Sequence, residues 1–167
     1  MIINKILEAL IAALLVAAVG VAFIAVIYRY VLDSALSWSF EVSLALLTYI
    51  TFLGGYLALR RNAHLKVDML VRRLPFWARG ALFLFNQAVI ATIGWIMAWH
   101  GGRQVLRFVD QTTNVLEIST AWYYIAIPIA GGLICLDALW NAVRGLLRLA
   151  RGQEPVDPSP DSLSAEI

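Results

Sequence analysis

The chain has 167 residues, of which 61% are hydrophobic and only 14% are charged, and its formal net charge is +2 at pH 7. Soluble domains have about 45–50% apolar and about 25% charged residues. The composition therefore excludes an ordinary water-soluble domain and indicates a chain that folds in a lipid bilayer.

Four stretches contain no Asp, Glu, Lys or Arg: residues 9–28, 42–59, 80–99 and roughly 118–136. At a rise of about 1.5 Å per residue, each can cross a hydrocarbon core of about 30 Å as a helix. We predict an all-α, integral membrane four-helix bundle in residues 1–151, with helices at about 6–29, 38–60, 76–100 and 118–140. The first stretch is longer than the apolar region of a secretory signal, so we expect it to be retained.

In the first predicted helix, Ala9, Ala13 and Ala17 follow one another at four-residue steps, which makes one face of the helix nearly smooth. Helices in lipid pack closely across such faces. Two alternatives remain open, because the face can pack within the chain's own bundle or against a separate partner subunit.

The first connection is bordered by residues suited to a membrane interface. Arg29 ends the first predicted helix, and Trp38 and Glu41 open the second. An aromatic ring prefers the headgroup level, and the helix dipole favours a carboxylate in the first turn. We interpret these residues as an interfacial anchor.

The second connection is predicted to be an amphipathic segment on the cytoplasmic side. Arg60, His64, Asp68 and Arg72 recur every four residues, as in a helix that lies along the interface. Basic residues attract anionic phospholipids by about 1 kcal/mol each near the surface. We expect the following residues to contact lipid headgroups: Arg60, Arg61, Lys66, Arg72 and Arg73.

Basic residues also predict the orientation, because Lys and Arg are enriched in cytoplasmic loops. Ten of the thirteen lie at the N-terminus, in the second connection or after the fourth helix. Only Arg29, Arg103 and Arg107 lie on the other side. We therefore predict that both termini are cytoplasmic. Residues 152–167 are polar, acidic and Pro-rich, and we expect a disordered cytoplasmic tail there.

The predicted spans have little that could carry chemistry. Glu8, Glu41 and Asp137 lie at the ends of the predicted helices, so no ionisable group is expected near the midplane. Ion-coupled transporters usually place such groups there. Pro128 removes a backbone donor from the fourth helix and predicts a kink. The pattern favours a supporting subunit over one that conducts a solute.

No cofactor, metal site or enzymatic activity is predicted, and no nucleic-acid partner. The two histidines, His64 and His100, would lie on opposite sides of the bilayer, about 30 Å apart, so they cannot ligate one haem. Cys135 is the single cysteine, which excludes an intramolecular disulfide.

Several short motifs occur in a fixed order along the chain. The most specific runs from Phe52 to Asp68 and contains Gly54, Gly55 and His64. The others are Arg29-Tyr30, Trp38 with Glu41, Leu74-Pro75, and Trp122 followed by Ile127-Pro128. Over about residues 5–150, the chain resembles the small membrane subunit of tripartite ATP-independent periplasmic (TRAP) transporters, the DctQ-like family. Phe40 and Tyr49 depart from the family pattern, where an acidic residue and a Trp are common.

The resemblance implies a three-part transport system in the inner membrane of a bacterium or archaeon. A periplasmic receptor (DctP-like) captures an organic acid or similar solute, and a large membrane subunit (DctM-like) carries it with a sodium gradient. The small subunit is then a scaffold and a possible docking surface, and the sodium and substrate sites belong to the large subunit. Two other classes compete with this interpretation: a membrane anchor of a redox enzyme complex and, less favoured, a small multidrug exporter, which would need a carboxylate within the first span.

Overall fold

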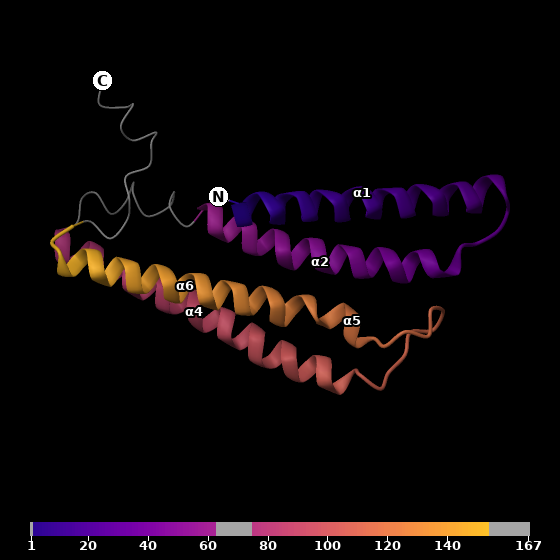
Figure 1. Cartoon of the computed structure of the whole chain (residues 1–167). Coiled ribbons are helices and arrows are strands. Elements are labelled where there is room, and N and C mark those ends of the chain that lie inside the picture. The colour runs from indigo at the N-terminus through magenta and orange to yellow at the C-terminus, as the bar shows by residue number, and fades with distance from the viewer. Residues whose placement is uncertain (1, 63–74, 154–167) are drawn as a thin grey trace, which may run out of the picture.

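The computed structural model describes residues 2–62 and 75–153 of the chain. Its helices are α1 (Ile2–Val31), α2 (Ser37–Asn62), α4 (Phe76–Arg107), α5 (Ala121–Tyr124) and α6 (Ala126–Ala150) (Figure 1). The one-turn helix α5 and α6 together form the fourth span, Ala121–Ala150. The predicted all-α four-helix bundle is confirmed, whereas the direction in which it crosses the membrane stays a prediction.

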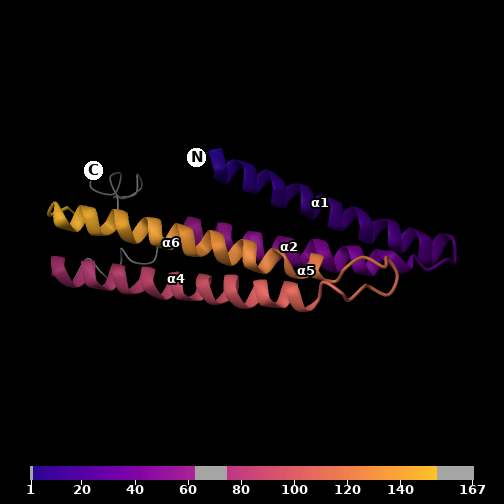
Figure 2. The same ribbon diagram turned by 60° about the horizontal axis from the view of Figure 1, so that its bottom comes forward.

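The bundle consists of two helix pairs. Helix α1 packs along α2, α4 packs along α6, and the two pairs meet where α2 contacts α6. In both views α1 lies at the outer side of α2, away from α4 (Figures 1 and 2). We call the end of the bundle with Arg60 and Arg148 the basic end, and the end with the connections 32–36 and 109–120 the loop end.

The two helix pairs are offset along the bundle axis (Figure 1). Arg60, two residues from the end of α2, pairs with Asp137, which lies thirteen residues before the end of α6. At a rise of about 1.5 Å per residue, α6 therefore extends about 16 Å beyond α2 at the basic end.

Two glycines set the close contact between α4 and α6. A Cβ atom at Gly94 would lie 2.7 Å from the backbone nitrogen of Cys135, and one at Gly131 would lie 2.6 Å from that of Ala98. Any larger residue at these positions would push the backbones apart. The absence of both side chains lets the helices approach closely, as small residues do in membrane bundles.

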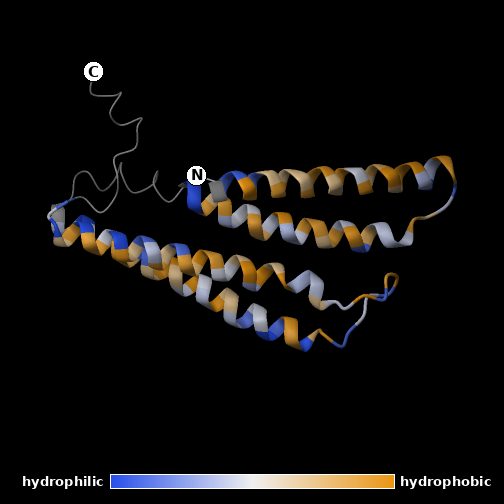
Figure 3. Cartoon of the chain, viewed as in Figure 1, coloured by the Kyte–Doolittle hydropathy of each residue, from blue (hydrophilic) through white to orange (hydrophobic). Residues whose placement is uncertain are grey.

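Hydrophobic residues occur along all four long helices (Figure 3), and many large ones are exposed on the outside of the bundle. Val16 on α1, Phe40 on α2 and Leu136 on α6 are each more than two-thirds exposed. Within residues 2–62 and 75–153, four helices are long and apolar enough to cross a membrane. A soluble protein would bury such a surface, so this one fits contact with lipid.

The fourth span extends further than its uncharged stretch. Helix α6 continues to Ala150, where Gly152 has a left-handed φ of 71° and donates its N–H to the carbonyl of Leu149. This glycine conformation ends helices readily. As a result, Asp137 lies eleven residues into the 25-residue helix α6, and its placement at the end of a predicted span is corrected. The uncharged stretch ended at this aspartate, but the helical backbone did not.

The fourth span is interrupted near its start. The regular helix is interrupted at Ile125, between α5 and α6, although this residue keeps helical dihedral angles, donates its N–H to the carbonyl of Ala121 and accepts from the N–H of Ile129. Pro128 has no N–H, so the carbonyl of Tyr124 lacks its intrahelical donor. Nearby, the hydroxyl of Tyr49 on α2 donates to the carbonyl of Trp122 at 2.9 Å. This bond ties the middle of α2 to the start of the fourth span.

Candidate functional site: an ion pair between the two helix pairs

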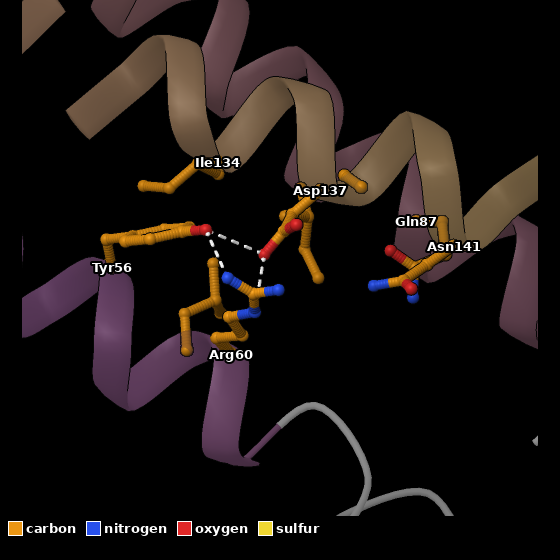
Figure 4. Close-up of a pocket in the computed structure, with 9 residues that line it drawn as sticks. Tyr56, Arg60, Gln87, Ile134, Asp137 and Asn141 are labelled. Atoms are coloured by element: carbon orange, nitrogen blue, oxygen red, sulfur yellow. Dashed lines mark hydrogen bonds and ion pairs between the residues drawn. The ribbon is translucent and has the colours of Figure 1, made fainter. Parts of the chain in front are cut away.

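The strongest polar cluster inside the bundle lies where α2 meets α6. Tyr56 and Arg60 are one helical turn apart on α2, and Asp137 and Asn141 are one turn apart on α6. The four-residue spacing places each pair on one face of its helix. The two faces meet beside Gln87 of α4 (Figure 4).

Asp137 is the centre of this cluster. Its Oδ2 atom lies 3.2 Å from Nε of Arg60 and accepts a hydrogen bond from the hydroxyl of Tyr56 at 2.9 Å (Figure 4). Arg60 also donates from Nη1 to the Tyr56 hydroxyl at 3.1 Å. The three side chains thus form a closed triangle in which the carboxylate charge is balanced by the guanidinium.

A small, open pocket of about 20 Å³ lies beside the triangle. Its polar lining includes Gln87, which is 4% exposed, and Asn141, with Ile90 and Ile134 as apolar neighbours. Figure 4 shows the two amide side chains next to each other, one from α4 and one from α6. The pocket is open, and the side chains of Arg60 and Asp137 remain 30% and 27% exposed.

The contacts of this cluster suit a structural role, because they hold α2 and α6 together. Oδ2 of Asp137 contacts both a guanidinium and a phenol, so the charge of this carboxylate is already paired within the bundle. Across residues 2–62 and 75–153 there is no cluster of His, Cys, Asp and Glu that could hold a metal ion. An ion pair of this kind makes two charged side chains tolerable within a lipid-embedded bundle.

A second ion pair ties α1 to α2. Nη2 of Arg61 lies 2.5 Å from Oε1 of Glu8. The adjacent residues Arg60 and Arg61 thus bind carboxylates on two different helices, α6 and α1. Their predicted contact with lipid headgroups stays a prediction, and both now have protein partners.

The predicted motif residues lie at scattered places in the structure. Arg29 is in the last turn of α1, Trp38 and Glu41 are in the first turns of α2, Pro75 precedes α4, and Pro128 is the third residue of α6. A Cβ atom at Gly54 or Gly55 would meet nothing within 4 Å among the described residues, so these glycines serve no close packing in that part of the chain. Five predicted residues lie outside the described ones: His64, Lys66, Asp68, Arg72 and Arg73.

The small-residue face of α1 does not pack within the bundle. Ala9, Ala13 and Ala17 are exposed, whereas Ile11, Leu14 and Ala18 are partly covered. Residues 2–62 and 75–153 leave this face exposed, which favours a partner subunit, and the packing of the face stays a prediction. The face is free for lipid or for another subunit.

The central role of Asp137 was missed at the sequence level, because the residue was assigned to the end of a span. The sequence does show that Tyr56 and Arg60, and likewise Asp137 and Asn141, are four residues apart, which places each pair on one face of a helix. A basic and an acidic residue on two apolar helices point to an interhelical ion pair.

Residues 5–148 match the family model described as the DctQ component of tripartite ATP-independent periplasmic transporters. The chain is 27% identical over 160 residues to the sialic acid TRAP transporter small permease protein SiaQ of Vibrio cholerae, a match that covers 93% of this chain and 92% of SiaQ. It is 25% identical over 151 residues to a Haemophilus influenzae protein that bears the name of a TRAP transporter small permease, covering 90% of this chain and 94% of that one.

A third relative is longer. The sialic acid TRAP transporter permease protein SiaT of Haemophilus influenzae is 28% identical over 128 residues, which are 76% of this chain but 21% of SiaT. These relatives are transporter subunits and give no support to a redox-enzyme anchor. The chain therefore belongs to the DctQ family: it is a small inner-membrane permease subunit of a TRAP transporter, works with a large permease subunit and is not an enzyme.

Proposed function

We propose that this subunit is the scaffold of a receptor-dependent, sodium-coupled transporter for an organic acid or similar solute. In this proposal the large subunit holds the sodium and substrate sites, and the small subunit supports it without a cofactor of its own. The observation that carries the proposal is the triangle around Asp137. The carboxylate of Asp137 pairs with Arg60 and Tyr56, which supports a structural role for it over a role in ion coupling.

The substrate class follows from the relatives. Two of them are named for sialic acid, which is an organic acid. We propose an anionic organic solute for this system as well, recognised by residues on the other two components. The receptor would dock at the loop end, which faces the periplasm in the orientation that the basic residues favour.

Anionic phospholipids are the proposed partners of the basic end. Arg72 and Arg73 belong to the connection with the four-residue polar repeat, and this repeat favours a position along the headgroup layer. Replacing both by Gln should lower the amount of anionic phospholipid that stays bound to the protein purified in mild detergent, while bound zwitterionic phospholipid stays the same. Equal amounts of anionic phospholipid on variant and wild type would contradict this role.

Reconstitution tests the scaffold proposal directly. The chain alone in liposomes should take up no solute under an inward sodium gradient. Adding the large subunit and the receptor should give uptake that stops when the gradient is removed. The matched control is the large subunit with the receptor but without this chain, which should transport poorly. Sodium-driven uptake by this chain alone would overturn the proposal.

A further inference from the structure

The loop end contains a second carboxylate with long-range contacts. Glu41 lies in the second turn of α2, and the 109–120 loop connects α4 to α5. Oε1 of Glu41 accepts the backbone N–H of Val115 at 3.0 Å, and Oε2 accepts that of Leu116 at 3.1 Å. One side chain thus uses both oxygens to hold a loop more than 70 residues away in sequence.

The loop has internal order of its own. Thr112 and Ser119 form an antiparallel bridge, the N–H of Thr113 donates to Ile118 at 2.8 Å, and the N–H of Thr120 donates to Gln111 at 2.7 Å. The Ser119 hydroxyl donates to the carbonyl of Val109 at 2.8 Å. These bonds close the base of the loop and leave residues 114–117 as its tip.

The tip needs an acceptor from outside the loop. The backbone pairing stops at Thr113 and Ile118, so it does not include the amides of Val115 and Leu116. A carboxylate that accepts two consecutive amides satisfies both donors at once and fixes their direction. Glu117, the next residue, adopts a left-handed φ of 53°, which turns the chain back toward Ile118.

We propose that Glu41 is a positioning residue that holds the tip of the 109–120 loop against the start of α2. The contact joins the two helix pairs at the loop end, as Arg60 and Asp137 join them within the bundle. It gives the surface outside the membrane one fixed shape. The functional part, that receptor binding depends on this shape, rests on the proposed function.

Hydrogen exchange of the chain in nanodiscs tests the contact. In wild type, the amides of Val115 and Leu116 should exchange more slowly than the amide of Glu117 beside them, and this comparison needs no variant. In E41Q, which offers one acceptor oxygen in place of two, their exchange should be about three- to tenfold faster, the range for one ordinary hydrogen bond. The matched control is D110N, because it removes one negative charge from the same loop and Asp110 is exposed. Unchanged exchange in E41Q, or equal acceleration in D110N, would overturn the proposal.

Uptake by the full three-part system tests the functional part. The receptor concentration for half-maximal uptake should rise about three- to tenfold in E41Q, by the same hydrogen-bond range, with an unchanged maximal rate and normal recovery of the complex. D110N should behave as wild type. If wild type shows receptor-dependent uptake and E41Q matches it at every receptor concentration, the positioning role is wrong. If wild type itself shows no receptor dependence, the proposed function has failed, and the exchange data still decide whether Glu41 holds the loop.

Discussion

The guanidinium of Arg60 lies 3.2 Å from the carboxylate of Asp137, and this ion pair joins the last turn of α2 to the middle of α6. The two helices belong to different helix pairs, so the ion pair is a tie between the two halves of the bundle. It is reinforced by Tyr56, whose hydroxyl contacts both charged groups.

Removing one charge of this ion pair should destabilise the bundle more than removing both. R60Q or D137N leaves one charged group without its counterion in a partly buried site, which we expect to cost about 1–3 kcal/mol because both side chains keep some exposure. The double variant R60Q/D137N should recover part of the loss. Thermal unfolding in detergent measures all three. Additive losses in the double variant would show that the two residues do not interact.

The close contact between α4 and α6 predicts that G131A lowers the stability of the bundle and that G132A, at the neighbouring glycine, does not. G131A places a Cβ atom 2.6 Å from the backbone nitrogen of Ala98, and this overlap should cost about 1–3 kcal/mol. G132A is the matched control, because a Cβ atom there meets nothing within 4 Å and the loss of a helical glycine should stabilise by up to about 1 kcal/mol. Midpoints of thermal unfolding would order the variants, and equal midpoints would refute the close contact.

The exposed alanine face of α1 predicts where a partner packs. A13L should reduce copurification with the large subunit, because it widens the face that includes Ala9 and Ala17. A12L provides the control, since Ala12 is also exposed but points about 100° away around the helix. The yield of large subunit per tagged small subunit is the readout. A stronger effect of A12L would assign the contact to a different face.

Reporter fusions test the orientation. A reporter after Arg151 or within residues 61–73 should report the cytoplasm, and one within residues 103–117 should report the periplasm, because the basic residues divide ten to three. A periplasmic signal from residues 61–73 would invert the bundle and move the proposed receptor side to the other end.

The helices themselves could be read from the sequence, whereas the contacts between them could not. Uncharged stretches locate the four spans because each has the length of the hydrocarbon core. The end of α6 could not be found this way, since a stretch without charges ends at Asp137 and a helix ends where its backbone hydrogen bonding stops.

Contacts between residues far apart in the sequence could not be predicted for a similar reason. Glu41 was assigned to a helix terminus, where a carboxylate is favoured whatever else it binds. Its bonds to Val115 and Leu116 depend on how a distant loop folds back onto α2. The contact between Gly94 and Gly131 likewise depends on the register of α4 against α6, which two isolated glycines do not specify.

The adjacency of Arg60 and Arg61 has a consequence for how this subunit can evolve. The two side chains diverge by about 100° around α2, and each reaches a carboxylate on a different helix. Inserting or deleting one residue in the last turns of α2 would rotate both guanidiniums together and separate each from its carboxylate. Exchanges of one apolar side chain for another leave this geometry intact. Related chains should therefore vary in the apolar side chains of α2 while keeping its length constant.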